Sequence, residues 1–242
     1  MNAVEIRQLT LSFADKPLFV DFNFDIAHAR WSAVLGRSGV GKSTLLRVIA
    51  GLEQNALKSG KITFKHCRNH QQKIAFMAQN DGLFPWLSVL DNVQLAQHLQ
   101  GTKNQASRQQ ALSLLEQVQL ADYQHKPCYR LSGGQRQRVA LARTLMQSSD
   151  LILMDEPFSA LDVVTRQQLY QLATTLLAEK TVLLVTHDPQ EALQLCDDIF
   201  VLQKQTDRVV LSQKISAVVH SAQQPQFWQL YQQLFSLLQE ES

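Results

Sequence analysis

A glycine-rich turn between an apolar segment and a helical one limits the folds open to this chain more than any other feature. The segment SAVLG (32–36) is apolar, GRSGVGKST (36–44) fits the pattern G-x-x-x-x-G-K-[ST], and KSTLLRVIAG (42–51) has the spacing of an amphipathic helix. A strand, a glycine loop and a helix in this order form a cradle for phosphate groups, because bare backbone N–H groups and the positive end of the helix dipole point to one place. The alternative is a glycine-rich turn that fits the pattern by chance, and the flanking strand and helix argue against it.

Each part of this loop has an expected task. Its glycines let the backbone wrap closely around an anion. Lys42 is expected to reach the β- and γ-phosphates of a nucleotide, and the Ser43 hydroxyl is expected to bind Mg²⁺. The residues expected to bind the nucleotide here are Gly36, Arg37, Ser38, Gly39, Val40, Gly41, Lys42, Ser43 and Thr44.

A second segment, LILMDEP (151–157), completes such a site. Four apolar residues predict a buried strand that delivers Asp155 and Glu156 to its carboxyl end, where ligands bind in open α/β sheets. Asp155 is expected to hold Mg²⁺ through water, and Glu156 to polarise or align an attacking water. An Asp-Glu pair after a strand is weak evidence alone, since a solvated strand end fits it as well. Together with the phosphate loop, the Asp-Glu pair becomes strong evidence for a nucleotide site.

Composition limits the class of protein. The chain has 242 residues, of which 45% are hydrophobic and 18% charged, as expected for one globular domain or a core with a subdomain. The formal net charge is +2, with Lys and Arg scattered, so we expect no nucleic-acid partner. Three separated cysteines, Cys67, Cys128 and Cys196, indicate a reducing compartment and give no disulfide framework or zinc site. Without a signal-peptide layout or a membrane-spanning apolar run, we expect a cytoplasmic protein whose membrane role depends on a partner.

Hydrophobic periodicity predicts an α/β fold. The segments 4–13 and 20–26 alternate apolar and polar residues, as half-buried antiparallel strands do. The runs 32–36, 73–79, 151–156 and 181–187 are apolar throughout, which is typical of parallel strands covered on both faces. Helical spacing occurs at 42–50, 88–100, 105–119, 134–147, 162–178 and 189–196. We therefore expect a phosphate-loop NTPase core with a mixed, largely parallel sheet, an antiparallel β subdomain and a helical insertion.

We expect a single domain over 1–242 with three parts. The α/β core takes in 1–82 and 149–205, a helical subdomain occupies 83–148, and a strand and a helix fill 206–242. The last helix, FWQLYQQLFSLL (227–238), has an apolar stripe that predicts packing on the core: Phe227, Leu230, Tyr231 and Leu234. Attachment to a membrane surface is the alternative, but the helix lacks the basic face typical of such helices.

The segment LSGGQRQRVALARTL (131–145) has helical spacing but opens with two poor helix formers, Gly133 and Gly134. Bare backbone at a helix N-terminus makes an anion site with room for a large ligand. LSGGQ precedes LILMDEP, and His187 closes the apolar run TVLLVTH (181–187). In this combination the chain resembles the nucleotide-binding subunit of ATP-binding-cassette (ABC) transporters over nearly its whole length. A glycine-rich cap of an ordinary helix remains the alternative for the glycines alone.

The resemblance implies an ATPase that works as a head-to-tail pair. In that family the LSGGQ helix does not touch ATP on its own subunit but caps the γ-phosphate held by the partner's loop. By the same resemblance SALD (159–162) is the loop that crosses the interface, and its Asp162 is expected to lie near the nucleotide of the opposite subunit, as one of the nucleotide-binding residues. The second subunit is expected to be another copy of this chain. The residues of one subunit expected to bind the ATP held by the other subunit are Ser132, Gly133, Gly134 and Gln135.

The resemblance also assigns catalytic residues and ligands of Mg²⁺. Gln79 matches a glutamine that contacts Mg²⁺ and the attacking water. His187 matches the histidine that holds the γ-phosphate and that water. With Glu156 these two are the expected catalytic residues, and Ser43, Gln79 and Asp155 are the expected metal ligands.

Two positions near the nucleotide are less distinctive. Phe13 stands where the family commonly has an aromatic residue that stacks on adenine, although it could equally end an alternating core pattern. Arg37 replaces the Pro or Asn often found early in the loop. That position contributes mainly backbone, so the departure puts little in doubt.

The segment NDGLFPWLSVLDNV (80–93) is expected to contact an integral membrane permease subunit. In the family this region receives the coupling helix of the membrane subunit. Residues 84–87 form an apolar, aromatic loop, which is unusual for a surface exposed to water. The alternative is that Trp86 folds into the core of the helical subdomain. Ser88 followed by Asp91 predicts a helix start.

The Pro-Trp pair followed by SVLDNV resembles importers of nitrate, sulfonates, taurine and thiamine precursors. This implies a peripheral subunit on the cytoplasmic face of the inner (cell) membrane that hydrolyses ATP to power import of a small anionic or heterocyclic solute, with a solute-binding protein as a further partner. The alternatives are an exporter or lipoprotein-release ATPase, and ABC ATPases that act on DNA or ribosomes. The ABC ATPases that act on DNA or ribosomes usually carry a long coiled coil, extra domains or a second cassette, and none of these is found in this sequence.

Overall fold

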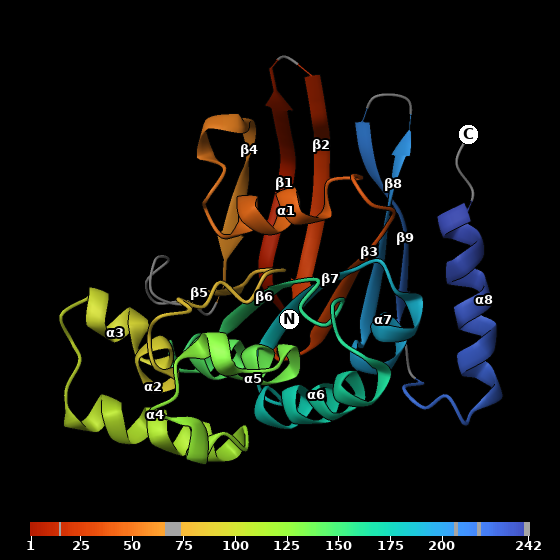
Figure 1. The fold of residues 1–242 in the computed structure, drawn as a ribbon. Coiled ribbons are helices and arrows are strands. Elements are labelled where there is room, and N and C mark those ends of the chain that lie inside the picture. The colour runs from red at the N-terminus through yellow and green to blue at the C-terminus, as the bar shows by residue number, and fades with distance from the viewer. Residues whose placement is uncertain (15, 66–73, 206–207, 217–218, 240–242) are drawn as a thin grey trace.

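The protein folds around one continuous sheet (Figure 1), in a computed structural model that describes residues 1–14, 16–65, 74–205, 208–216 and 219–239. Its nine strands follow the order β4-β1-β2-β9-β8-β3-β7-β6-β5. The strands are β1 (Asn2–Phe13), β2 (Lys16–Ala27), β3 (Trp31–Leu35), β4 (Leu57–Phe64), β5 (Ile74–Met77), β6 (Leu151–Asp155), β7 (Thr181–Thr186), β8 (Asp198–Gln205) and β9 (Arg208–Ser216). The helices are α1 (Lys42–Ile49), α2 (Val89–Val93), α3 (Leu95–Leu99), α4 (Gln105–Gln117), α5 (Gly133–Leu145), α6 (Val163–Leu176), α7 (Pro189–Leu195) and α8 (Pro225–Gln239).

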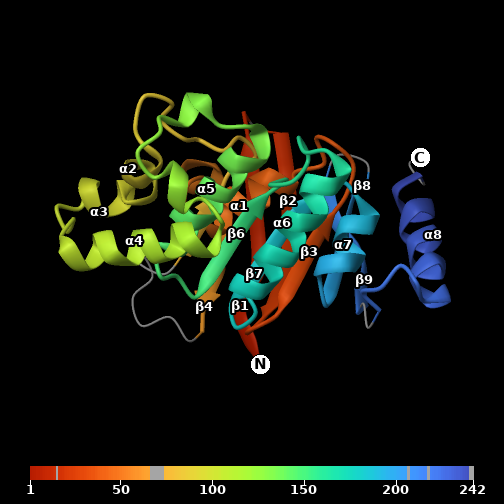
Figure 2. The ribbon, with the colours of Figure 1, turned by 60° about the horizontal axis from the view of Figure 1, so that its bottom comes forward.

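Five neighbouring strands, β8-β3-β7-β6-β5, are paired in parallel. The central strands β3, β6 and β7 are buried at every residue. Helices α5, α6 and α7 cover one face of this part of the sheet (Figure 2), and α1 packs on the other. The prediction of parallel strands from fully apolar runs is confirmed for β3, β5, β6 and β7. Both ends of each of these strands lie within two residues of the expected bounds. Residue 73, expected in β5, lies outside the described residues.

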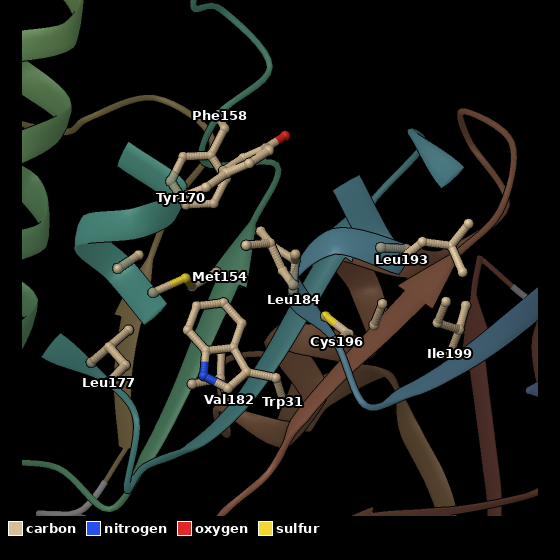
Figure 3. Close-up of a cluster of buried hydrophobic side chains, with 14 of the residues drawn as sticks. Trp31, Met154, Phe158, Tyr170, Leu177, Val182, Leu184, Leu193, Cys196 and Ile199 are labelled. Atoms are coloured by element: carbon tan, nitrogen blue, oxygen red, sulfur yellow. The ribbon is translucent and has the colours of Figure 1, made fainter. Parts of the chain in front are cut away.

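Alternate residues of each central strand enter different cores. In β3, Ala33 and Leu35 point toward the layer of α6 and α7, whereas Val34 points toward α1 and the antiparallel strands. Figure 3 shows the first of these cores, in which Phe158 and Tyr170 lie edge to face with ring centroids 5.1 Å apart. Burial of both faces fixes the register, because a slip of one residue would exchange the two sets of side chains.

Among the described residues, one residue pair links the antiparallel strands β1, β2 and β4 to the rest of the sheet by strand pairing. β1 pairs with β2 and β4, and Phe19 of β2 pairs with Val209 of β9. Strands β4 and β8 were not among the predicted strands. In β4 the first five residues are exposed, so no alternation marks it in the sequence. Gly60 has a φ of 105°, and a Cβ there would lie 2.6 Å from the Leu9 Cα, so glycine permits the close approach of β4 to β1.

Helices α2 to α5 lie between β5 and β6 in the sequence, and α2, α4 and α5 share a core of their own, which includes Leu90, Leu115 and Val139. The helix expected over 88–100 is wrong in one respect, because it is divided at Gln94. The Gln94 backbone leaves helical geometry, with ψ at 11°, and its fully buried side chain donates a hydrogen bond to Ser107 Oγ at 3.0 Å. Among the described residues, none of the helices combines the length and hydropathy that crossing a membrane needs.

The tail helix packs on the core, and two of the three cysteines lie among the described residues. In α8, Phe227 and Leu234 are fully buried against the core, as the apolar stripe predicts. Cys128 and Cys196 are buried free thiols. Cys67 lies outside the described residues.

A buried carboxyl lies between α6 and α7. Glu191 of α7 is 5% exposed and accepts a hydrogen bond from the Tyr170 hydroxyl at 3.0 Å. Burial, which disfavours the charged carboxylate, raises the pKa of Glu191 from 4.5 to about 7. Hydrogen bonds from Thr186 and Tyr170 offset part of this effect.

Glu191 should make the stability of the fold depend on pH. Between pH 4.5 and about 7 the folded chain keeps a proton on Glu191 that the unfolded chain has lost, so stability falls as pH rises through this window. The loss amounts to about 3 kcal/mol. We expect the unfolding free energy of the native chain, relative to Glu191→Gln, to fall by that amount between the two pH values in denaturant titrations. Parallel pH profiles of the two proteins would mean that Glu191 titrates as an ordinary exposed carboxyl.

Candidate functional site

The carboxyl ends of β3, β6 and β7 bring the expected site residues to one edge of the sheet. β3 leads into the loop before α1, β6 ends at Asp155, and β7 ends directly before His187. Beside them lies a cavity of about 550 Å³. It is lined by Phe13, Leu18, Ser38, Gly39, Gly41, Lys42, Ser43, Thr44, Gln79, Glu156 and His187.

The glycine loop has the backbone that a phosphate cradle requires. Gly39 and Gly41 have φ of 79° and 113°, in the left-handed region that side chains disfavour. Lys42 is 4% exposed, and its Nζ donates to the carbonyl oxygens of Gly36 and Arg37 at 2.8 and 2.9 Å. Burial lowers the pKa of Lys42. The ammonium is therefore held inside the loop, where an anion can share it.

Ser43 and Asp155 form an oxygen pair at the start of α1. The Ser43 hydroxyl donates to Asp155 Oδ1 at 2.8 Å, and burial raises the pKa of Asp155. Mg²⁺ prefers oxygen ligands such as a hydroxyl and a carboxylate. The donor set therefore fits this ion.

Three candidate catalytic side chains meet at the Glu156 carboxylate. Oε2 of Glu156 lies 3.0 Å from His187 Nδ1 and accepts from Gln79 Nε2 at 3.4 Å. Oε1 lies 4.0 Å from Lys42 Nζ. Glu156 also has a φ of 45°, which side chains rarely adopt, so the surrounding fold imposes this conformation. No motif in the sequence predicts this backbone conformation.

The opposite wall of the cavity comes from the antiparallel strands. Phe13 is 42% exposed at the end of β1, so it does not end a core pattern. Leu18 lies beside it and would be in contact with a Cβ at Gly41. Leu18 could not be identified as a site residue from the sequence, because no motif distinguishes it from the other apolar residues of β2.

Not every predicted nucleotide-binding residue lines this cavity. Val40 is buried in the core beneath the loop, and Asp162 caps α6 by accepting from the Thr165 N–H at 3.0 Å. That backbone hydrogen bond lowers the pKa of Asp162. Gly36 and Arg37 line a neighbouring cavity of about 430 Å³, together with His187 and residues of α8.

The start of α5 lies apart from the lining of the 550 Å³ cavity. Ser132 and Gln135 form a capping box, in which each side chain accepts a hydrogen bond from the other's backbone N–H. The two glycines differ. A Cβ at Gly134 would lie 2.4 Å from Thr165 Cγ2, so packing against α6 favours glycine there. A Cβ at Gly133 would meet no atom within 4 Å, so nothing in the described part of the chain accounts for glycine at that position.

The segment 80–93 displays aromatic side chains from an anchored loop. Trp86 is 70% exposed and packs edge to face on Phe84, so it does not fold into the helical core. The fully buried Asn92 side chain hydrogen-bonds both the N–H and the carbonyl of Phe84, at 2.8 and 3.0 Å. Arg143 of α5 donates to the Gly82 carbonyl at 2.8 Å, which ties the loop to α5.

Comparisons with known proteins agree with this geometry. A family model described as ABC transporter matches residues 19–159. An ABC transporter ATP-binding protein of Haemophilus influenzae is 49% identical over 97% of this chain and 98% of its own length. The aliphatic sulfonates import ATP-binding protein SsuB 1 of Paracoccus denitrificans is 41% identical over 83% of this chain and 79% of its own. A solved ABC transporter described as of the metal-chelate type superposes with a TM-score of 0.76 at 27% identity, covering 90% of this chain and 84% of its own. The chain therefore belongs to the ABC transporter family, as an ATP-binding ATPase domain with the phosphate-loop α/β fold.

Proposed function

We propose that this protein is the ATP-hydrolysing subunit of a membrane importer for small organic anions of the sulfonate type. The observation that carries the catalytic part is the convergence of His187, Gln79 and Lys42 on the Glu156 carboxylate. A carboxylate in such a place can orient and deprotonate an attacking water, while an imidazole and an ammonium stabilise the charge of the transferred phosphoryl group.

The loop and the acidic strand end divide the binding of ATP. The 36–44 backbone and Lys42 would hold the phosphates, and Phe13 and Leu18 would pack against the base. Ser43, Asp155 and Gln79 would hold Mg²⁺, which neutralises phosphate charge when it is bound.

A second copy of the chain would complete the site. Ser132 to Gln135 do not line the cavity beside their own phosphate loop, and Gly133 has open space where a ligand could approach. A helix N-terminus with free backbone N–H groups is suited to a γ-phosphate presented by another subunit. The loop 159–162, with Asp162 at the start of α6, would face the same interface.

The exposed aromatic loop supports a partner in the membrane. Phe84 and Trp86 would contact a permease subunit on the cytoplasmic face of the cell membrane. Because Arg143 ties this loop to α5, movement of α5 toward a second ATP would be passed to the permease. In this proposal the helical subdomain expected over 83–148 would move as one unit.

The cargo class comes from relatives. Proteins named for aliphatic sulfonate import include one from Paracoccus denitrificans at 41% identity and one from Rhodococcus jostii at 46% over 195 residues. Co-purification of tagged Glu156→Gln protein with ATP, followed by mass spectrometry, tests the assembly. A polytopic membrane protein and a sulfonate-binding extracytoplasmic protein would support the proposal. Ribosomes or DNA-associated proteins without a membrane subunit would overturn it.

Lys42→Ala should weaken ATP binding by about tenfold to a hundredfold, because it removes charged hydrogen bonds to phosphate. Calorimetric titration with ATP measures the effect. Lys103→Ala, which removes a surface ion pair with Asp91, serves as the control and should bind as the native chain does. Equal affinity of Lys42→Ala and the native chain would rule out the phosphate-loop assignment.

Glu156→Gln should keep ATP affinity but lower kcat by about a hundredfold or more, since the amide cannot accept a proton from water. With hydrolysis blocked, ATP and Mg²⁺ should accumulate a dimer that light scattering detects. A variant that stays monomeric under these conditions would contradict the proposed pairing of two subunits.

Gly133→Arg should leave the fold and ATP binding of the monomer intact, because the position opens onto free space. It should reduce hydrolysis to background by blocking the approach of the second subunit. Thermal unfolding, calorimetric titration and phosphate release test the three parts. Leu99→Arg, on the exposed α3, is the surface control. Loss of ATP binding in the monomer would mean that α5 serves the nucleotide of its own chain.

A further inference from the structure

Arg166 joins two segments that border the site. It lies in the first turn of α6, where its Nη2 donates to the Leu161 carbonyl oxygen at 2.8 Å. Its Nη1 lies 3.7 Å from Asp188 Oδ2. Leu161 belongs to the loop 159–162, and Asp188 directly follows His187. A single planar guanidinium therefore holds both segments.

The turn that carries His187 is held from several directions. Thr186 Oγ1 accepts from the Asp188 N–H at 3.0 Å, and Asp188 Oδ1 caps the start of α7. Thr186 also hydrogen-bonds to Glu191, which accepts from Tyr170. Tyr170 follows Arg166 by one turn, and it is drawn beside Phe158 in Figure 3. One face of α6 thus contacts Asp188 directly and reaches Thr186 through Glu191.

The loop 159–162 is tied directly to Glu156. The Ser159 N–H and hydroxyl both donate to the Glu156 carbonyl oxygen, at 3.3 and 3.0 Å. Glu156 is the residue with a φ of 45°, so a displacement of the loop acts on a backbone that the fold already constrains.

These contacts form a closed series of residues that begins and ends at Glu156. The Glu156 side chain contacts His187, and the Glu156 main chain accepts from Ser159. We propose that Arg166 is a positioning residue for ATP hydrolysis, which makes the loop 159–162 and the contact of His187 with Glu156 move together. The series runs in the order Glu156, His187, Asp188, Arg166, Leu161 and Ser159.

The proposal rests on the proposed function, because it needs Glu156 and His187 to act on ATP and the loop 159–162 to face a second subunit. Through Arg166, contact of the second subunit with the loop reaches His187, so that hydrolysis accelerates when two copies are paired. The Arg166 and Asp188 side chains are 27% and 36% exposed, and ion pairs of this kind add little to stability. Their loss should therefore affect turnover rather than folding.

Arg166→Met tests the link. We expect kcat for ATP to fall by about tenfold or more, with KM changed by less than about twofold, because the nucleotide cradle is untouched. Asp188→Asn keeps the cap of α7, since Asn caps helices as well as Asp, but removes the charge that faces Arg166. The double variant should be no slower than Arg166→Met alone, because both changes break one link. The nitrogen NMR signals of the His187 imidazole should shift in both single variants.

Arg138→Met is the matched control. Arg138 also contacts α6, at Gln168, and its other partners are Val118 and Gln119, so kcat should equal that of the native chain. Unchanged kcat in Arg166→Met and Asp188→Asn, with an active native chain, would overturn this inference and leave the proposed function standing. Additive losses in the double variant would overturn it as well. If Arg166→Met does not fold, the kcat and His187 signals of Asp188→Asn decide the question. A native chain without Mg²⁺-dependent hydrolysis would instead overturn the proposed function.

Discussion

Burial of three adjacent strands from both sides is the constraint on which the rest of this structure depends. β3, β6 and β7 are buried at every residue, so they carry no charged side chain before their carboxyl ends. The charged and titratable side chains lie at the carboxyl ends of these strands, where Asp155 is the last residue of β6, and Glu156 and His187 directly follow β6 and β7. Since parallel strands end at the same edge, the apolar interior itself gathers the site.

This constraint explains which parts of the fold could be predicted. Long apolar runs and a 3.6-residue period report burial directly, so the parallel strands β3, β5, β6 and β7 and most helices were located correctly, and the fold class is confirmed. The parallel strand β8 was missed. The edge strand β4 was missed because its exposed first half has no pattern that burial would impose. The break at Gln94 was missed because it depends on a hydrogen bond to Ser107, a residue of another helix.

The site shows the same division. Residues carried by local motifs, such as the glycine loop, could be named from the sequence, because a strand, a turn and a helix suffice to place them. Residues whose position depends on distant elements could not. Gly133 and Gly134 are equivalent in the sequence, yet Thr165 of α6 makes one of them a packing requirement and leaves the other open. Arg166 has no motif at all, and only the approach of α7 brings Asp188 within its reach.

The left-handed backbone of Glu156 sets the stability of the fold against the need for a carboxylate at this position. A residue other than glycine in this conformation costs about 1 to 3 kcal/mol, which the fold must absorb to keep the carboxylate in place. Stability alone would favour glycine at position 156, and the proposed catalytic role of Glu156 would favour the acid. A duplicated copy freed from selection on its chemistry would therefore gain stability by drifting to glycine here. In such a copy, a change from Glu156 to glycine should therefore occur early, before substitutions that alter the rest of the fold.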